Sequence, residues 1–366
     1  MPSTFGKYRL IQRIGGSQLS QVYRVGRMDT PGNTGVALKR VDPRLIGNQD
    51  FVQLVTREAG ILSRMKHPNL CVCHEMGLVD GCAFLTLDLV RGCTLRALMR
   101  RASQMDIPLP TSTAIALCYQ LAQVLDYLHR KCAHTIVHLD LSPQNVMVSQ
   151  KGEIRLIDFG IARRLDGQNP PPLGGKIAGT VGYMSPEQAR GEKTLGSSAD
   201  LFGLGILLWE MLTGQRLFRG NTPETWERMR TGEVPAHNAA MNKHPKAMTE
   251  LVLSLLAPDP EARPSEIGEI LPKLEECSSS PNSGRRPLAA LITRLMGEPD
   301  FDPFDKIDIE EEGIPLSNIP TGEKDAVLGY EELCIQIDQG EGSPCAHIRA
   351  AVPNEQEVPS SPFLEH

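Results

Sequence analysis

The stretch HLDLSPQN, residues 138–145, places a carboxylate and an amide oxygen five residues apart in a polar segment. A carboxylate such as that of Asp140 is a residue type that can take part in general acid–base chemistry. The side-chain oxygen of Asn145 is a hydrogen-bond acceptor. Pro143 stands between the two and limits the freedom of the backbone. The stretch therefore suggests a loop that holds two polar groups in fixed positions.

Other chemically capable side chains occur before and after this stretch. Thirteen residues after Asn145 comes Asp158, which begins the triplet Asp-Phe-Gly and directly follows the short run IRLI. Far upstream, the run VALK ends at Lys39, and Glu58 follows nineteen residues later. A lone lysine or aspartate is normally a solvated surface charge. These residues can act together only if the fold brings distant parts of the chain to one place.

Short strands are predicted over most of the first ninety residues. The segments YRLIQRIGG, QLSQVYRV and TGVALKRV are β-branched or alternating, and glycine-bearing turns separate them. Two more strands are expected within residues 67–90, around an Asp80-Gly81 turn. Between the two groups, residues 48–65 carry apolar side chains at helical spacing. The sequence thus predicts a small β-rich unit with one helix.

From Thr111 onward the pattern becomes helical. The apolar residues of 112–132 fall on one helix face, and a Gly/Pro-rich loop covers 160–182. Beyond Cys277 come a linker composition, the amphipathic stretch PLAALITRLMGE, and an acidic, proline-interrupted tail that we expect to be poorly ordered. Further helices are expected at 199–213, 223–231, 247–257 and 265–276.

Composition and charge limit the class of protein. At 366 residues the chain can bury a substantial core, and its longest apolar run, 201–212, is too short to cross a bilayer. The first residues lack the cationic start and apolar stretch of a secretory signal, so we expect none, and nine scattered cysteines fit a reducing compartment. We therefore expect a cytoplasmic protein. Residues 298–366 carry 17 acidic and 3 basic residues, a net of −14, so that residues 1–297 carry +8 within the total of −6.

The order of these motifs resembles that of eukaryotic-type (Hanks-type) serine/threonine protein kinases, which bacteria also carry. The resemblance covers roughly residues 8–276. It implies a bilobal α+β fold, with a small β-rich N-lobe carrying one helix (8–90) and a larger, mainly helical C-lobe (91–276). Residues 277–366 fall outside it as linker and tail. The resemblance also implies phosphorylation of serine and threonine hydroxyls on proteins, with ATP and Mg²⁺ as cofactors.

The resemblance assigns roles in catalysis to the residues named first. Asp140 would accept or orient the proton of the substrate hydroxyl. Asn145 and Asp158 would be the ligands of magnesium, which bridges the phosphates. Lys39 would hold the α- and β-phosphates and would be oriented by Glu58.

A pocket for the nucleotide base is also implied by the resemblance. Leu87 would be its gatekeeper, and the backbone of Asp88 and Val90, the hinge, would bond the base. The phosphate-facing turn and the walls of the pocket would be formed by Gly15, Ile14, Val22, Ala37 and Met147.

Downstream motifs favour a protein kinase over a kinase of small molecules. GTVGYMSPE resembles the substrate-facing loop and the Ala-Pro-Glu motif of the family, with serine in place of alanine. The resemblance implies that Thr180 bonds Asp140 and helps to select a serine or threonine hydroxyl. It further implies that Asp200 braces the backbone of the catalytic loop and that Arg263 pairs with Glu187. A small-molecule kinase remains an alternative, but it does not account for these features together.

Two departures from the family pattern weaken the expected nucleotide chemistry. The glycine-rich loop IGGSQLSQVY has Ser17 and Ser20 where glycines are usual, and glycine permits the close approach of backbone to phosphate. Ser142 stands where the family usually has a lysine, and losing a transition-state donor can cost on the order of 10²–10³ in rate. We expect slow transfer. The alternative is a pseudokinase, a nucleotide-binding or scaffolding module in signalling.

A third departure concerns the residue before Asp140. Many kinases have an arginine there, which grips a phosphate on the activation loop. Leu139 cannot do this, and residues 161–178 contain no Ser, Thr or Tyr. We therefore expect activity that does not depend on phosphorylation of this loop.

The expected partners are protein substrates, with no nucleic acid and no membrane span. Gln144 removes one acidic feature that often accompanies a preference for basic substrates. The acidic tail could compete for a cationic groove on the kinase core, although a solvated, disordered tail is the simpler interpretation.

Overall fold

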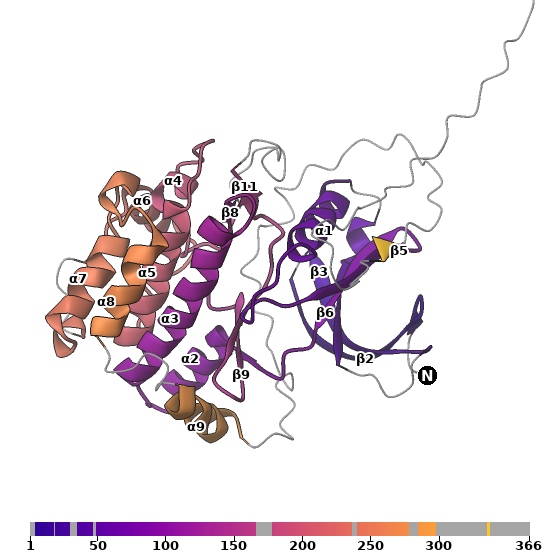
Figure 1. Ribbon diagram of the computed structural model, residues 1–366, viewed down its shortest axis with the longest axis horizontal. Coiled ribbons are helices and arrows are strands. Elements are labelled where there is room, and N and C mark those ends of the chain that lie inside the picture. The colour runs from indigo at the N-terminus through magenta and orange to yellow at the C-terminus, as the bar shows by residue number, and fades with distance from the viewer. Residues whose placement is uncertain are drawn as a thin grey trace, which may run out of the picture.

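The computed structural model describes residues 4–17, 19–29, 35–46, 49–165, 178–235, 240–277 and 285–297, together with the backbone of a short strand at 335–336. A curled sheet with one helix lies beside a larger helical part (Figure 1). This arrangement confirms the predicted bilobal α+β fold. None of the described helices has the length and apolar character needed to cross a lipid bilayer. The expected low order of the linker and the tail falls mainly outside the described residues.

Antiparallel strands form the sheet of the N-lobe, in the order β1-β2-β3-β4-β6-β5-β12. Asp80 and Gly81 have φ angles of 50° and 74°, as a two-residue hairpin turn requires, so the predicted turn between β5 and β6 is confirmed. The strands are β1 (Thr4–Phe5), β2 (Tyr8–Gly16), β3 (Ser20–Arg27), β4 (Val36–Val41), β5 (Cys73–Val79), β6 (Cys82–Asp88) and β12 (Ile335–Gln336).

Helix α1 (Gln49–Leu62) packs against β4, β5 and β6. Val55, Ala59 and Leu62 are buried on its inner face, at the spacing of an amphipathic helix. Glu58 lies on that same face and is only 1% exposed. Because the apolar face of α1 packs on the sheet, the carboxylate of Glu58 is held between the helix and the sheet.

Helices make up most of the C-lobe, and short strands separate its loops. The helices are α2 (Leu95–Gln104), α3 (Thr111–Asp126, continued by a π turn at Tyr127–Lys131), α4 (Pro186–Ala189), α5 (Ser198–Thr213), α6 (Pro223–Thr231), α7 (Lys246–Leu255), α8 (Ile270–Glu276) and α9 (Arg285–Met296). Single 3₁₀ turns occur at Pro43–Leu45, Met241–Lys243, Pro260–Ala262 and Ile267–Glu269. The strands are β7 (Gly92–Thr94), β8 (Ile136–Val137), β9 (Val146–Ser149), β10 (Ile154–Leu156) and β11 (Arg163–Arg164).

Helix α5 forms the centre of the C-lobe. Every residue from Ala199 to Leu212 is buried, and α3 and α7 pack against the helix. A helix that is apolar on all sides is stable only inside a protein. Two carboxylates, Asp200 and Glu210, are buried with it, and each is hydrogen-bonded to loops near the candidate site.

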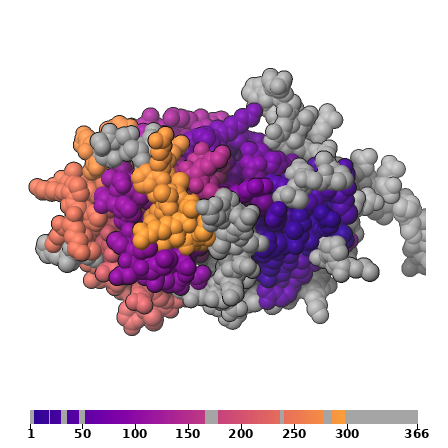
Figure 2. Space-filling view, turned by 90° about the horizontal axis from the view of Figure 1, so that it is seen from below, coloured from indigo at the N-terminus to yellow at the C-terminus, as the bar shows by residue number. Residues whose placement is uncertain are grey.

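Helix α9 lies beyond residue 276, where the resemblance places the end of the kinase domain. It packs on α2 and α3, at the lower edge of the C-lobe in Figure 1, and is visible as orange atoms on the surface in Figure 2. Arg101 Nε donates a hydrogen bond to the carbonyl of Leu295 at 3.2 Å. The apolar stripe of α9 is buried and consists of Leu288, Leu291, Ile292 and Leu295. The domain limit at 276 stays a prediction, but folded structure continues past it.

Candidate active site

Residues 138–145, which we call the catalytic loop after their expected role, connect β8 to β9, and Asp200 on α5 holds the beginning of this loop. Asp200 accepts hydrogen bonds from the backbone N–H groups of His138 and Leu139, both at 2.8 Å. The ring of His138 packs edge-on against Phe159 with the ring centres 4.7 Å apart. The predicted brace from Asp200 is therefore confirmed, and His138 lies in the core. Because buried backbone donors need partners, this carboxylate fixes the path of the loop.

Hydrogen-bond donors surround the carboxylate of Asp140. Oδ1 accepts from the backbone N–H of Thr180 at 2.8 Å and from its hydroxyl at 2.7 Å, which confirms the expected contact. Oδ2 accepts from Asn145 Nδ2 at 2.7 Å. Burial raises the pKa of Asp140, the hydrogen bonds from Thr180 partly offset this rise, and the negative charge of Asp158 adds to it.

Lys39 joins the two lobes electrostatically. Its Nζ lies 2.8 Å from Glu58 Oε2 on α1 and 2.9 Å from Asp158 Oδ1, next to the catalytic loop. Burial disfavours the charged ammonium, but the two carboxylates outweigh this effect and raise the pKa of Lys39. Burial likewise disfavours the Asp158 carboxylate, but Lys39 outweighs it and lowers that pKa. Both groups are therefore charged at neutral pH.

The donor set near Asp140 suits magnesium. The amide nitrogen of Asn145 is bonded to Asp140, so its oxygen is the atom that can ligate a cation. Asp158 meets Lys39 through Oδ1, so Oδ2 is its candidate ligand atom. Among the described residues, no group of three or more His, Cys, Asp and Glu could hold a metal ion. Two protein oxygens are enough for Mg²⁺, which usually completes its shell with water and substrate phosphates.

Most of the residues expected to line a base pocket lie on neighbouring strands of the N-lobe sheet, whereas Met147 lies on β9 in a separate sheet. Val22 on β3 is opposite Lys39 on β4, and Ala37 is opposite Leu87 on β6. Side chains alternate along a strand, so Ala37 and Lys39 point to the same side of the sheet. Gly15 pairs with Val22 at the end of β2. Three of the expected wall residues are each 8% exposed: Ile14, Ala37 and Met147.

The hinge at the end of β6 is hydrogen-bonded to the residues that directly precede β5 and β4. The N–H of Asp88 donates to the carbonyl of Val72, and the N–H of Leu89 donates to that of Gly35, both at 3.1 Å. The side chain of Asp88 also bonds His74 at 2.8 Å. These bonds fix the segment without testing the contacts expected between the base and the backbone of Asp88 and Val90, which stay a prediction.

Ser17 closes the turn between β2 and β3 on itself. Its Oγ accepts from the N–H groups of Leu19 at 3.1 Å and Ser20 at 3.2 Å, and its own N–H donates to the carbonyl of Ser20 at 2.8 Å. Such side-chain bonds compete with other acceptors for backbone donors. A phosphate at this turn would have to displace the serine hydroxyl, which gives a physical reason for the expected weak nucleotide binding.

No cationic side chain replaces the lysine that the family usually carries at the position of Ser142. Ser142 is fully buried, and its hydroxyl has no hydrogen-bond partner within the described part of the chain. Instead, Gln144 reaches the site, which the sequence did not reveal. Its Nε2 donates to Thr180 Oγ1 at 3.1 Å. Nothing in the residue type distinguishes this glutamine from a solvated one, so only the geometry identifies it.

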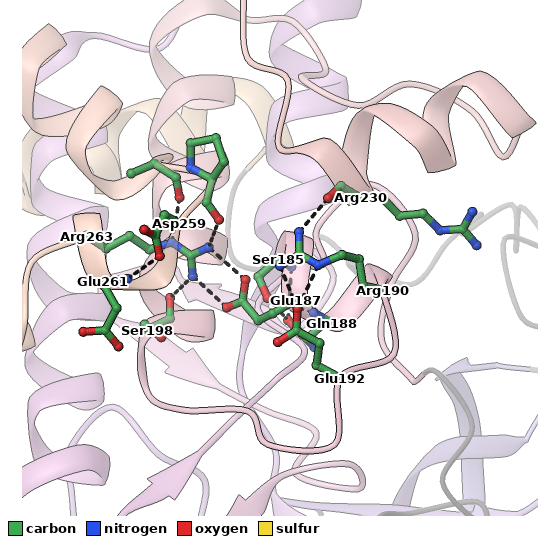
Figure 3. A network of polar contacts seen from close by, with 12 residues as sticks. Ser185, Glu187, Gln188, Arg190, Glu192, Ser198, Arg230, Asp259, Glu261 and Arg263 are labelled. Carbon is green, nitrogen blue, oxygen red and sulfur yellow. Dashed lines mark hydrogen bonds and ion pairs between the residues drawn. The ribbon is translucent and has the colours of Figure 1, made fainter.

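A buried ion pair supports the loop that carries Thr180. Arg263 binds Glu187 through two parallel contacts of 2.7 and 2.8 Å, as predicted, and also donates to the carbonyl of Ser198 (Figure 3). Paired contacts of this kind are among the strongest hydrogen bonds in proteins. From the same short helix, Gln188 donates to the carbonyl of Leu139 at 2.8 Å. Helix α4 is thus tied to α5 and to the catalytic loop.

Comparison with known proteins places these residues in context. The family described as "Protein kinase domain" matches residues 8–275. The chain is 30% identical over 280 residues to a probable serine/threonine-protein kinase of Clostridium perfringens, covering 75% of this chain and 39% of that protein. It is 28% identical to the tyrosine-protein kinase MasK of Myxococcus xanthus (81% and 47% covered) and 30% identical to the serine/threonine-protein kinase PknH of Mycobacterium tuberculosis (76% and 43%). The chain spans less than half the length of these relatives.

Proposed function

This chain belongs to the protein kinase family, and we propose that it transfers the terminal phosphoryl group of ATP to serine and threonine hydroxyls of protein substrates. The observation that carries the proposal is the pair of ion contacts from Lys39 to Glu58 and Asp158. These contacts join the N-lobe sheet, helix α1 and the Asp-Phe-Gly segment. They put a cation and a candidate metal ligand side by side, next to the loop that carries Asp140.

The residues of the site divide the work of phosphoryl transfer. Asp140, held from two sides by Thr180 and Asn145, orients the substrate hydroxyl and takes up its proton. Lys39 neutralises negative charge on the phosphates. Asn145 and Asp158 would hold Mg²⁺, which supplies further neutralisation when it is bound. Little covalent help is needed, because phosphoryl transfer depends mainly on positioning and electrostatics.

We further propose that activity needs no phosphate on the activation loop. Leu139 is 5% exposed and lies in an apolar cluster with Val137, Leu195 and Ala199. Ile161, the first residue after Asp-Phe-Gly, packs against this cluster. An apolar contact between the catalytic loop and the start of the activation loop therefore stands where other kinases use an arginine and a phosphate. Burial of apolar area stabilises such a contact in every phosphorylation state.

Transfer from radiolabelled ATP to a generic basic acceptor protein tests the main proposal, with Asp140→Asn measured alongside. We expect label on serine and threonine in the wild type and none above background in the variant. Label on tyrosine alone would instead support a tyrosine kinase, the activity named for the relative MasK. Binding of the magnesium–ATP complex with no transfer in either protein would support the pseudokinase.

Phosphatase treatment followed by mass spectrometry tests the second proposal. We expect the treated protein to retain full activity. Thr180 and Tyr183 are the nearest acceptors after the loop, and both hydroxyls are engaged, with Asp140 at 2.7 Å and with Glu210 at 2.8 Å respectively. A phosphate found on either residue and required for activity would overturn the proposal.

A further inference from the structure

Gln144 begins a chain of hydrogen bonds that ends at the candidate catalytic carboxylate. Its Nε2 lies 3.1 Å from Thr180 Oγ1, which in turn lies 2.7 Å from Asp140 Oδ1. The side chain of Gln144 is exposed, so it is not there to fill the core. The three residues come from two segments, the catalytic loop and the loop before α4, that are far apart in the sequence.

The direction of these bonds follows from counting protons. A threonine hydroxyl has one proton to donate, and an ionised carboxylate can only accept. The proton of Thr180 must therefore point to Asp140. Its oxygen is then the acceptor for the amide nitrogen of Gln144. If the amide were turned around, the oxygen of Gln144 and the carboxylate of Asp140 would both need the single hydroxyl proton of Thr180. The amide group of Gln144 thus keeps the hydroxyl of Thr180 directed at Asp140.

This contact gains importance because no cation accompanies Asp140 at the usual position. Ser142 is fully buried there, and Lys39 is engaged with Glu58 and Asp158. Among the described residues, the hydrogen-bond donors to the Asp140 carboxylate are neutral: the backbone N–H and hydroxyl of Thr180, and the amide of Asn145.

We propose that Gln144 is a positioning residue that acts on Asp140 through Thr180. This neutral chain, Gln144 to Thr180 to Asp140, takes over part of the orienting work that a lysine at position 142 would do. The inference rests on the proposed kinase function, because the orientation of Asp140 matters only if a substrate hydroxyl meets it. It makes a prediction that a solvated glutamine would not, namely that the effect of Gln144 depends on the hydroxyl of Thr180.

A double-mutant cycle with Gln144→Ala and Thr180→Val tests this dependence. Because a neutral hydrogen bond contributes modestly, we expect Gln144→Ala to lower kcat roughly three- to tenfold, with little change in KM for the acceptor. In the Thr180→Val background, the same substitution should have no further effect. Gln53→Ala is a matched control, because Gln53 is exposed on α1 and should leave kcat unchanged. Equal losses in both backgrounds, or a change in KM alone, would overturn the proposal in favour of direct contact with the substrate.

Gln144→Glu separates the donor role from size. A carboxylate cannot donate to Thr180 and would attract its proton away from Asp140, so we expect a larger loss of kcat than for alanine. NMR of the nucleotide-free protein gives a readout that needs no activity, since the chemical shift of the Thr180 amide reports its hydrogen bond to Asp140. We expect Gln144→Ala to move this chemical shift, and to move it much less in the Thr180→Val background. That result in a protein without transferase activity would uphold the chain of hydrogen bonds and refute the kinase function. An active enzyme in which Gln144→Ala changes neither kcat nor the chemical shift would refute the role of Gln144 alone.

Discussion

Ser142 offers the most direct way to change the rate at a single residue. A lysine there would add a charged donor beside the reacting groups, and removing such donors from enzymes costs on the order of 10²–10³ in rate. We expect Ser142→Lys to raise kcat about tenfold, less than the full effect because the side chain must leave a fully buried position. Steady-state kinetics measure it. Ser142→Met is the control of similar length without charge, and an equal gain in that variant would contradict the electrostatic explanation.

The pH dependence of transfer should reflect the environment of Asp140. Burial and the charge of Asp158 raise its pKa, while Thr180 and the nearby His138 oppose the rise. In its proposed role as a base, Asp140 acts only when ionised, so we expect kcat/KM to fall as the pH drops through this pKa. We therefore expect the acidic limb above the ordinary carboxyl value of about 3.9.

Ser142→Lys reverses the sign of that effect. An ammonium near Asp140 favours the ionised carboxylate and lowers its pKa. The acidic limb of the kcat/KM profile should therefore move to lower pH in this variant and stay in place in Ser142→Met. A limb that is identical in all three proteins would show that Asp140 does not set it.

The main residues of the site could be predicted from their types and order, whereas their fine contacts could not. Lys39, Asp140 and Asp158 stand in motifs that can be recognised from the order of residues along the chain. The structure brings these residues close together. The bonds of Gln144 and Ser17 depend on which rotamer each side chain adopts and on which backbone groups lie near it. A sequence does not carry that information, so both contacts appear only in the structure.

Among the elements, the apolar cluster around Leu139 decides how the activation loop is anchored. Leu139 has a φ of 65°, unusual for a leucine, and is held there by packing and by the bond from its N–H to Asp200. We expect Leu139→Ala to lower the free energy of unfolding by about 2–5 kcal/mol and to reduce kcat, because Ile161 loses its partner. Urea denaturation and kinetics measure the two effects. Leu165 is exposed and lies four residues after Ile161. Leu165→Ala should therefore leave the free energy of unfolding and kcat nearly unchanged.

Helix α2 has a local helical pattern that the sequence analysis did not use. In its sequence LRALMRRASQ, the buried residues Leu95, Leu98 and Ala102 recur at helical spacing. Thr94 caps the helix by accepting the N–H of Ala97 at 3.1 Å. The long helices α3 and α5 have continuous apolar faces and were predicted almost to their ends. The local pattern of α2 indicates a helix, but it does not identify the neighbours that bury its apolar face, which include α9.

At the level of the whole molecule, α9 marks where the compact body extends beyond the kinase motifs. Leu288 is fully buried against the C-lobe. We expect Leu288→Ala to destabilise the full chain by about 2–5 kcal/mol in urea denaturation, because it opens a cavity in a packed face. Thr293→Ala, on the exposed side of the same helix, should be close to neutral. Equal effects in both variants would mean that α9 does not dock in solution.

The position of α9 also determines how the acidic tail must be tested. A chain ending at residue 277 loses the tail and the α9 packing together, so a change in its activity cannot be assigned to charge. A chain ending at residue 297 keeps α9 and removes the segment of net −14, together with the two-residue edge strand β12 that pairs with β5.

We expect the chain that ends at 297 to keep the full-length activity and salt dependence, as for a solvated tail, and the chain that ends at 277 to unfold at lower urea. If the tail instead competes for a cationic groove, its removal lowers KM for an acidic acceptor protein, and added salt lowers KM in the full chain alone, because salt screens the tail's attraction to the core. Kinetics of the three chains at low and high salt separate the two outcomes.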